Sequence, residues 1–320
     1  MALLGRAPPG VGEIMDLSVI ILELNTRDLL RECLTSLEQS GIKHPSSSYS
    51  VEVIVADNGS NDGSVEMVKS NFPWVKLIEN RRNLGFSKGN NAALPYASGR
   101  YVLFLNSDTQ VFRETLTEMI RFMDKNPEIG ASTCYLELKR IGGLDFNSHR
   151  GFPTPFSALT YFSGLHKIFP RSKLFGGYYQ TYKDLSVTHE VDVIEGAFMV
   201  VRREAAEKVA FSPNVWWDED FFFYGEDIDF CYRIKQVGYK IYYYPKVKTI
   251  HYKGATHGFN KQGVAELSDE DRQKLVKATT AAMKIFYQKH YAAKYHPLVT
   301  WLVFTAITVL SRFRSLKRGI

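Results

Sequence analysis

Residues 51–64 read VEVIVADNGSNDGS: six mostly apolar or β-branched residues, then an aspartate and a loop of asparagine, glycine and serine. Such a run predicts a buried strand that ends at Asp57. Similar apolar runs occur at residues 17–22 (LSVIIL), 75–78 and 101–105 (YVLFL), and segments with helical leucine spacing separate them. Strands that alternate with helices form parallel sheets wound by right-handed crossovers. We therefore expect an α/β fold with a mostly parallel central sheet flanked by helices.

The chain beyond residue 110 has a less regular pattern. Residues 139–190 are rich in glycine, proline and aromatic residues, which indicates long loops and short helices over a site. A buried strand is expected at 191–202, and a helix that opens at residues 225–229 follows. Residues 240–244 (KIYYY) predict a strand that stops at Pro245, and residues 247–251 predict another.

The composition is that of an ordinary folded protein. Of the 320 residues, 45% are hydrophobic and 23% are charged, which excludes wholesale disorder. The net charge is +6, and the last ten residues hold the cations Arg312, Arg314, Lys317 and Arg318 without an acidic residue. This distribution indicates a basic tail and no nucleic-acid-binding face. The three cysteines are far apart and odd in number, which favours a reducing, cytoplasmic compartment.

An apolar run precedes the basic tail at residues 298–310 (LVTWLVFTAITVL). A helix that crosses a bilayer needs about 20 apolar residues, so this run is too short to span one. Apolar residues with a tryptophan, followed by cations, are typical of a helix in the interface of an anionic leaflet. We expect residues 298–320 to contact the inner face of the cell membrane peripherally. The alternative is a helix packed on the domain with a solvated tail.

The two common glycine-rich nucleotide motifs are missing from the sequence. No G-x-G-x-x-G follows the first strand and no G-x-x-x-x-G-K-[ST] occurs, which disfavours a nicotinamide-dependent dehydrogenase and a phosphate-loop ATPase. Polar residues follow the first two strands instead, namely Glu23 and Asn25 after the first and Asp57 after the second. Ligands of parallel sheets gather at these carboxyl ends. Asp57 can accept the N3–H of a uracil or thymine ring; the alternative is that it caps its own turn.

A further strand-end acid lies in the sequence Asn106-Ser107-Asp108. A diphosphate carries charge that Mg²⁺ or Mn²⁺ neutralises, and these hard cations prefer carboxylate oxygens. Since only Asp108 is acidic, phosphate oxygens, water and one further side chain would supply the remaining ligands. The alternative is an aspartate that serves only the turn.

Glu226 and Asp227 form the third acidic motif, after an aromatic run and Gly225. They lie at the start of a predicted helix, where the helix dipole favours carboxylates. A partly desolvated carboxylate there can act as a general base on an attacking hydroxyl, whereas a purely structural pair would serve only the helix. His251, beyond the next strand, is either a metal or phosphate ligand or a structural histidine.

In combination, these segments resemble the family-two inverting glycosyltransferases of the GT-A (nucleotide-diphospho-sugar transferase) fold, especially their bacterial rhamnosyltransferase-like branch. The residues that carry the resemblance lie between about 17 and 254 and read SVIILELN, VIVADNGSNDGS, ENRRNLGFSKGNNAAL, YVLFLNSDT, IEGAFMVVRREA and DEDFFFYGEDIDFCYRIKQVGYKIYYYPKVKTIHYKG. Residues 139–190 lie outside the resemblance. Where the family has a small residue or asparagine and then tyrosine, this chain has Glu23-Leu24-Asn25, so an aromatic that flanks the base is missing.

The resemblance implies a division of the chain. Residues 1–15 form a flexible extension, where Met15 offers an alternative start, and residues 16–260 form the GT-A catalytic domain. Within that domain, residues 16–110 are the nucleotide-binding half and residues 111–260 the acceptor half. Residues 261–320 form a C-terminal helical extension. The first fifteen residues lack the apolar core of a secretory signal, so we expect no export.

The resemblance also implies a role for each motif. Asp108 corresponds to the last acid of the family's DXD-type metal motif, and His251 matches a histidine near the metal or diphosphate. Asp227 is similar to the catalytic base, and Glu226 would help to position the acceptor. Asp57 would face the nucleotide base. The implied donor-binding residues are Leu22, Glu23, Asn25, Asp57, Asn83, Gly85, Lys88, Gly89, Asn90, Asn106 and Ser107.

The implied activity is inverting transfer of a sugar from a nucleoside-diphosphate donor to a hydroxyl of a glycan or lipid-linked acceptor in cell-surface polysaccharide synthesis. On the resemblance alone we expect dTDP-rhamnose as donor, with UDP-sugars and GDP-mannose as alternatives. A non-catalytic nucleotide-sugar-binding protein is a rival class, but it would have little use for Glu226 and Asp227. A nucleotidyltransferase needs a glycine-rich, basic triphosphate loop after the first strand, which LELNTRDLL does not provide.

Overall fold

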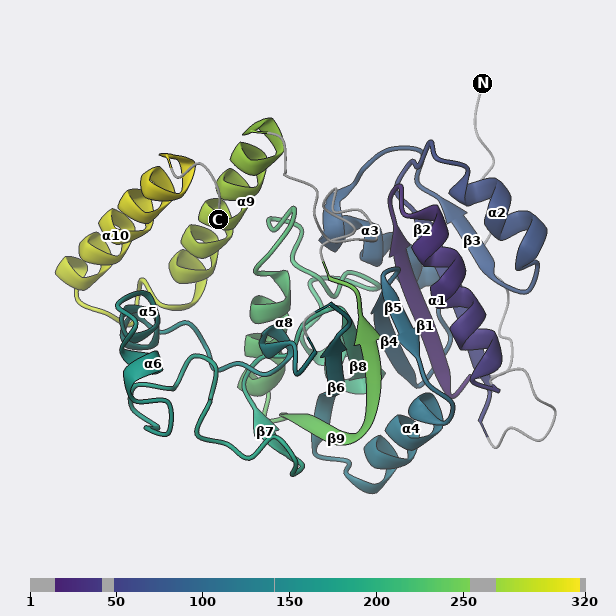
Figure 1. Cartoon of the computed structure of the whole chain (residues 1–320), viewed down its shortest axis with the longest axis horizontal. Helices are drawn as coiled ribbons and strands as arrows, with labels where there is room; N and C mark the ends of the chain where they lie inside the picture. Colours follow the sequence, from purple (N-terminus) through teal and green to yellow (C-terminus); the bar gives the residue numbers. More distant parts are fainter. Residues whose placement is uncertain (1–14, 42–48, 141, 254–268, 317–320) are drawn as a thin grey trace.

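The computed structural model describes residues 15–41, 49–140, 142–253 and 269–316. The expected N-terminal extension up to residue 14, and the side chains of Arg314, Lys317 and Arg318 in the basic tail, lie outside the described part. Within the described residues, nine strands form one sheet in the order β3-β2-β1-β4-β8-β6-β9-β5, and β7 pairs with β9 beside this path (Figure 1). The strands are β1 Leu17–Glu23, β2 Val51–Asp57, β3 Lys76–Glu79, β4 Tyr101–Asn106, β5 Thr109–Val111, β6 Ile129–Leu138, β7 His189–Val191, β8 Phe198–Arg202 and β9 Lys240–His251.

The sheet is mostly parallel, as expected. β3, β2, β1 and β4 pair in parallel, and β6 pairs in parallel with β9. β8 is antiparallel to both β4 and β6, and β5 and β7 are antiparallel to β9. The apolar runs of the sequence form central strands because both of their faces are buried. In β1, for example, Val19 and Ile21 contribute to one core cluster and Ile20 to the other.

Helices cover both faces of the sheet. The first core cluster holds residues of α1, α2 and α4, and the second holds residues of α3, α7 and α8. α1 forms because its leucines recur on one face, and that face is buried. The helices are α1 Arg27–Gln39, α2 Ser64–Asn71, α3 Gly85–Ala93, α4 Thr115–Lys125, α5 Pro155–Phe162, α6 Leu165–Ile168, α7 Arg203–Lys208, α8 Glu226–Gln236, α9 Asp269–His290 and α10 Pro297–Leu316, with short 3₁₀ helices at η1 Leu94–Tyr96 and η2 Phe146–Ser148.

The expected end of a strand at Pro245 is wrong. β9 continues through this proline as one strand from Lys240 to His251. Its pairing with β6 shifts register where Tyr244 is opposite Cys134 and Lys248 is opposite the next residue, Tyr135. The irregularity accommodates a proline, which has no N–H to donate to the ladder. Consequently His251 lies at the carboxyl end of a long strand that runs parallel to β6.

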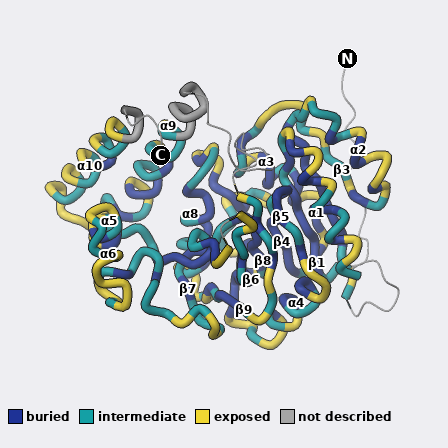
Figure 2. Tube along the Cα trace, in the orientation of Figure 1, coloured by how far each residue is buried: buried dark blue, intermediate teal, exposed yellow. Residues whose placement is uncertain are grey.

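The region between β6 and β8 consists of loops and short helices, as the sequence indicates. It holds η2, α5 and α6, and only the short strand β7 joins the sheet. At the same end of the molecule, α9 and α10 form a helical hairpin, and α9 contacts α8 (Figure 1). Much of α10 is exposed, whereas α9 buries part of its surface (Figure 2). No helix among the described residues combines the length and the apolar character needed to span a membrane.

Candidate active site

The carboxyl ends of β1, β2 and β4 meet at one edge of the sheet. Glu23 is in register with Asp57, and Leu22 is in register with Asn106. The polar residues that follow these strands are therefore neighbours, although about 80 residues separate the first from the last in sequence. This edge is where a parallel sheet binds its ligands.

Glu23 lies beneath this edge and is fully buried. Its Oε1 accepts a hydrogen bond of 2.6 Å from the Thr26 backbone N–H, and its Oε2 accepts one of 2.5 Å from the Thr26 hydroxyl. The hydroxyl of Ser64 also donates to Oε1, at 3.1 Å, and burial raises the pKa of the Glu23 carboxyl. The Thr26 hydroxyl in turn contacts the Ser107 hydroxyl at 2.8 Å. Glu23 and Thr26 thus connect the loop after β1 to Ser64 and Ser107. The carboxyl oxygens of Glu23 are therefore bonded within the protein and do not face a ligand.

Asp57 and Asn25 organise the loop after β2. The Asp57 carboxylate is buried and accepts the N–H groups of Gly59 at 2.9 Å and Ser60 at 3.1 Å. Gly59 has a φ of +86°, which a residue without Cβ adopts without strain. Asn25 accepts the N–H of Asn61 at 2.8 Å. The turn-capping alternative for Asp57 is therefore present in the structure, and its contact with a nucleotide base remains a prediction.

The glycine-rich segment before α3 packs against these strand ends. Asn83 Oδ1 accepts the N–H of Gly85, the first residue of α3, at 2.8 Å. A Cβ at Gly89 would lie 2.5 Å from the Leu22 side chain, so glycine permits the close approach of α3 to β1. Asn90 is buried and donates to the Phe86 carbonyl at 3.0 Å, whereas Lys88 is about half exposed. The Lys88 ammonium lies 3.8 Å from Glu219 Oε2.

Asp108 and His251 face each other at the ends of β4 and β9. Both are almost completely buried, and His251 Nε2 lies 3.4 Å from Asp108 Oδ1. His251 Nδ1 lies 3.0 Å from Asp145 Oδ2, and Lys253 Nζ donates to Asp145 Oδ1 at 2.5 Å. Burial alone would lower the pKa of His251, but Asp108 and Asp145 outweigh it and raise the pKa to about 10. The two carboxylates therefore favour positive charge at His251, which either a ring proton or a bound cation can supply.

The residues around His251 fit a divalent cation. Both carboxylate oxygens of Asp108 are buried and form no hydrogen bond with the described residues. Such oxygens are costly to bury without a partner, and a hard cation would satisfy them. Asp145, Glu195 and His251 each offer a ligand atom, and these atoms lie within 4.8 Å of one another. Of this group, the sequence singled out Asp108 and His251 but not Asp145 or Glu195.

Glu226 and Asp227 lie in the first turn of α8, after Gly225 with a φ of +84°. Asp227 Oδ2 accepts a hydrogen bond of 2.6 Å from Arg150, and both side chains of this ion pair are nearly buried. Glu226 Oε2 is buried without a hydrogen-bond partner among the described residues. Burial, followed by repulsion from Asp227, raises the pKa of Glu226 well above its ordinary value. Adjacent carboxyls therefore have different environments, as acid–base sites require.

Glu195 connects the two acidic groups. Burial, followed by the charge of Asp145, raises the pKa of Glu195, while the charges of His251 and Arg150 oppose this rise. Glu226 in turn interacts electrostatically with Glu195 and with Arg150. Electrostatic interactions thus link the group of Asp108, His251, Asp145 and Glu195 to the group of Glu226, Asp227 and Arg150. Asp57 lies at the end of β2 and belongs to neither of these groups.

Three residues of these two groups, Asp145, Arg150 and Glu195, were not expected from the sequence. Asp145 and Arg150 lie in the irregular region, where no periodicity assigns a position to a side chain. Glu195 had a weak signal, because it is a lone acid followed by Gly196 just before the buried strand β8. A charged residue beside a buried strand is unusual unless it is paired or functional.

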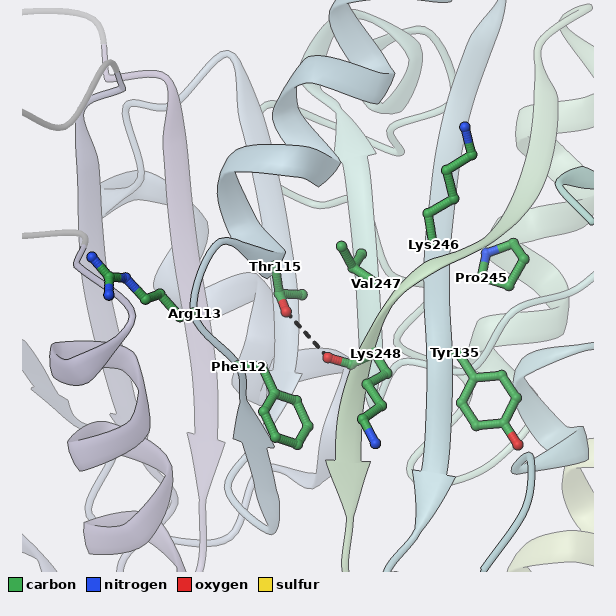
Figure 3. Close-up of a pocket in the computed structure, with 8 residues that line it drawn as sticks. All are labelled: Phe112, Arg113, Thr115, Tyr135, Pro245, Lys246, Val247 and Lys248. Atoms are coloured by element: carbon green, nitrogen blue, oxygen red, sulfur yellow. Dashed lines mark hydrogen bonds between the residues drawn. The ribbon is translucent and has the colours of Figure 1, made fainter. Parts of the chain in front are cut away.

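A separate surface pocket lies between the turn before α4 and the irregular part of β9 (Figure 3). It is lined by Phe112, Arg113, Thr115, Tyr135, Pro245, Lys246, Val247 and Lys248. Its one hydrogen bond among the residues drawn joins the Thr115 hydroxyl to the Lys248 carbonyl at 3.1 Å. The pocket includes none of the candidate catalytic, donor-binding or metal-binding residues.

Comparisons with known proteins identify the family of this chain. Residues 18–210 match the family described as Glycosyl transferase family 2. The chain is 25% identical to an N-acetylglucosaminyl-diphospho-decaprenol L-rhamnosyltransferase of Mycobacterium tuberculosis over 224 residues, which is 65% of this chain and 68% of that protein. It is 28% identical to the rhamnosyltransferase WbbL of Escherichia coli over 177 residues, which is 52% of this chain and 61% of that protein.

Solved structures show the same fold. The mannosyltransferase PcManGT from Pyrobaculum calidifontis, in complex with GDP-Man and Mn²⁺, superposes with a TM-score of 0.52 at 18% identity, covering 97% of this chain and 91% of that chain. GalNAc-T7 with UDP, GalNAc and Mn²⁺ superposes with a TM-score of 0.54 at 16% identity, covering 94% and 54%. The sheet order, the flanking helices and these likenesses identify the GT-A fold expected from the sequence.

Proposed function

The chain belongs to glycosyl transferase family 2, and from this premise we propose that it transfers a sugar, with inversion, from a nucleoside-diphosphate donor to a hydroxyl of a glycan or lipid-linked acceptor. The observation that carries the proposal is the pair of buried acidic groups, one around Asp108 and His251 and one formed by Glu226 and Asp227 with Arg150. The first group would neutralise the charge of the leaving diphosphate, and the second would take the proton of the attacking hydroxyl.

The Asp108 end would hold Mg²⁺ or Mn²⁺. Asp108 and His251 are the proposed ligands, because both Asp108 oxygens are buried without a hydrogen-bond partner among the described residues and His251 lies beside them. When bound, the cation supplies charge neutralisation to the departing diphosphate. Asp145 orients His251 through its Nδ1 atom and so directs Nε2 toward Asp108.

The Asp227 end would deprotonate the acceptor. Asp227 takes the proton of the acceptor hydroxyl, the hydroxyl oxygen bonds to the anomeric carbon, and the bond from that carbon to the diphosphate oxygen breaks. A single displacement from the opposite face inverts the anomeric configuration. Arg150 fixes the orientation of the Asp227 carboxylate through a hydrogen bond of 2.6 Å. Glu226, which is adjacent and has a raised pKa, would hold a proton and donate a hydrogen bond to the acceptor.

The donor half would bind the nucleotide at the strand ends. We assign the base to the Asp57 loop and the ribose and phosphates to the edge formed by Asn25, Asn106 and the start of α3. dTDP-rhamnose is the proposed donor, supported by the rhamnosyltransferases among the similar proteins. UDP-sugars and GDP-mannose are the alternatives.

A membrane surface would present the acceptor. Exposed apolar side chains are concentrated on α10 and in the α5–α6 region, and these helices lie at one end of the molecule (Figure 1). Neither residues 152–175 nor residues 291–313 include an acidic residue, and Lys167, Arg171 and Lys173 lie in the first range. Apolar groups with cations fit an anionic bilayer surface, so we assign a peripheral location at the inner face of the cell membrane. The exposed residues are Phe156, Leu159, Phe162, Ile168, Phe169, Leu174, Leu298, Trp301, Leu302, Val309 and Phe313.

A thermal-shift screen of nucleotide sugars with and without Mn²⁺ tests the donor assignment. We expect dTDP-rhamnose with Mn²⁺ to raise the melting temperature, because ligand binding stabilises the folded state. The Asp108→Asn variant should lose the Mn²⁺-dependent part of this shift. Release of nucleoside diphosphate with an acceptor then separates an enzyme from a nucleotide-sugar-binding protein. Absence of a shift with every dTDP-, UDP- and GDP-sugar would contradict the proposal.

Vesicle sedimentation tests the membrane assignment. The full chain should sediment with vesicles that contain phosphatidylglycerol, and a chain that ends at residue 297 should remain in the supernatant at moderate salt. Equal sedimentation of both chains would remove residues 298–320 from the membrane contact.

A further inference from the structure

The segment from Asp218 to Asp229, named here the acid segment, carries an unusual concentration of charge. It contains six acidic residues and no lysine or arginine. Two of the acids, Glu226 and Asp227, form the proposed acceptor-activating pair. Carboxylates this close repel one another, so the segment needs cations from other elements to keep one conformation. The six acids are Asp218, Glu219, Asp220, Glu226, Asp227 and Asp229.

One side of the acid segment is held by the donor half. Asn91 of α3 accepts the N–H groups of Trp216 at 3.1 Å and Trp217 at 3.0 Å, and donates to the Trp217 carbonyl at 2.9 Å. The Phe86 N–H also donates to the Phe222 carbonyl at 2.8 Å. The segment thus begins at a fixed place beside the donor-binding edge.

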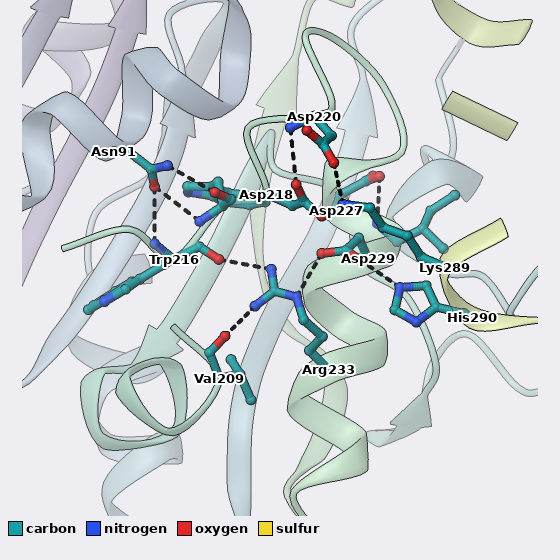
Figure 4. A network of polar contacts seen from close by, with 12 residues as sticks. Asn91, Val209, Trp216, Asp218, Asp220, Asp227, Asp229, Arg233, Lys289 and His290 are labelled. Atoms are coloured by element: carbon teal, nitrogen blue, oxygen red, sulfur yellow. Dashed lines mark hydrogen bonds and ion pairs between the residues drawn. The ribbon is translucent and has the colours of Figure 1, made fainter. Parts of the chain in front are cut away.

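The other side is held by α9, near the C-terminus of the chain (Figure 4). The Lys289 ammonium forms ion pairs with Asp218 and, at 2.7 Å, with Asp220. The next residue, His290, has its Nε2 2.7 Å from Asp229 Oδ1. Two consecutive residues of one helix therefore contact acids at both ends of the segment.

Burial makes these contacts energetically significant. Asp218 and Asp229 are almost fully buried, and Arg233 completes the pairing of Asp229 at 2.7 Å. Although burial alone would raise it, hydrogen bonds from His290 and Arg233 lower the pKa of Asp229. Loss of one partner of a buried ion pair leaves a buried charge unpaired, which is far more costly than loss of a surface pair.

Apolar packing fixes α9 in the same place. Phe221 in the middle of the acid segment is buried in a cluster with Ala282, Phe286, Tyr287 and Tyr291 of the C-terminal region. A Cβ on Gly225, immediately before Glu226, would lie 3.1 Å from the Ala282 methyl group. The helix thus touches the chain directly beside the two proposed acceptor-activating acids.

We infer that Lys289 and His290 are positioning residues that hold the acid segment so that Asp227 faces the acceptor, which makes α9 a part of the catalytic unit. This inference rests on the proposed function, because it assigns the purpose of the held segment to the activity of Asp227. Both residues lie beyond residue 210, where the family match ends. α10, the helix assigned to the membrane, is the partner of α9 in the hairpin.

Steady-state kinetics of Lys289→Ala test the inference. We expect kcat to fall by about 10-fold or more, because small displacements of a catalytic group have large effects on rate, while the affinity for the nucleoside diphosphate stays unchanged. Lys289→Arg should restore most of kcat, since a cation returns to Asp218 and Asp220. His290→Gln should lower kcat in the same way. Lys284→Ala is the matched control, because Lys284 lies on the same helix and forms no ion pair with any described residue.

Hydrogen exchange provides a readout that does not depend on turnover. In Lys289→Ala we expect faster amide exchange across Phe221–Ile228 and unchanged exchange in β1 and β2, whereas Lys284→Ala should match the parent chain. Lys289→Gln replaces Lys289→Ala if the latter does not fold. Unchanged kcat, or unchanged exchange in this segment, would overturn the positioning role. If exchange is faster in Lys289→Ala but the parent chain itself transfers no sugar, the proposed function is contradicted, while the contact between α9 and the acid segment is supported.

Discussion

The donor edge and the acceptor side of the site hold their aspartates in opposite ways. Asp57 at the donor edge is bound by the N–H groups of Gly59 and Ser60, within three residues of itself. Asp227 on the acceptor side is bound by Arg150, which is 77 residues away, and its segment is held by α9 about 60 residues further on. Local turn chemistry therefore holds Asp57, while tertiary contacts hold Asp227. Substitutions in the two regions should therefore differ in their effects on the rate of sugar transfer, the free energy of unfolding and nucleotide affinity.

The largest expected effect belongs to Asp227. Asp227→Asn keeps an oxygen that accepts from Arg150 but removes the base, so we expect the rate of sugar transfer to fall by about 10²–10⁴-fold. Nucleoside-diphosphate affinity, measured by calorimetry, should stay within about twofold because the donor edge is untouched. A variant with near-parental turnover would exclude Asp227 as the base.

Substitution of Arg150 should have the next largest effect, on the free energy of unfolding. Arg150→Met leaves the Asp227 carboxylate buried without its cation, and breaking such a pair costs about 3–5 kcal/mol of the free energy of unfolding. Denaturant unfolding measures this loss. Arg150→Lys keeps the charge and should lose distinctly less. If Arg150→Met were as stable as the parent chain, the pair would contribute nothing to the order of the acceptor side.

Asp57 should show the smallest effect on stability. Asp57→Ala removes hydrogen bonds to two backbone N–H groups that are partly accessible to water, which costs about 1–2 kcal/mol. The effect of this substitution on dTDP affinity distinguishes contact with the nucleotide base from a purely turn-capping role. A fall in dTDP affinity beyond the loss of stability supports contact with the base, and unchanged affinity reduces Asp57 to a turn cap.

The same contrast explains how far the sequence predicted the molecule. The parallel sheet and the Asp57 loop were predictable, because apolar runs, glycines and short polar turns act over a few residues. The sequence also marked Glu226 and Asp227 at a helix start. It could not assign Arg150 to Asp227 or Lys289 to Asp218, because pairs so far apart in sequence leave no local pattern. At Pro245 the rule that proline ends a strand gave a wrong prediction, because the register shift in β9 accommodates the proline.

Glu23 shows the limit of a motif taken alone. Its position at the end of β1 suggested a carboxylate beside the donor, yet its oxygens accept hydrogen bonds from Thr26 and Ser64 beneath the edge. Strand-end position predicted that Glu23 lies at this edge, whereas the direction of its side chain depends on Thr26 in the same loop and on the Ser64 hydroxyl from another loop.

The most direct measurement is a crystal structure of the protein with Mn²⁺ and dTDP. We expect Mn²⁺ against Asp108 and His251, with the diphosphate bound to it and the terminal phosphate directed toward the side of the site that carries Asp227. Mn²⁺ and nucleotide bound elsewhere, for example in the separate pocket with Arg113, Lys246 and Lys248, would contradict the central claim.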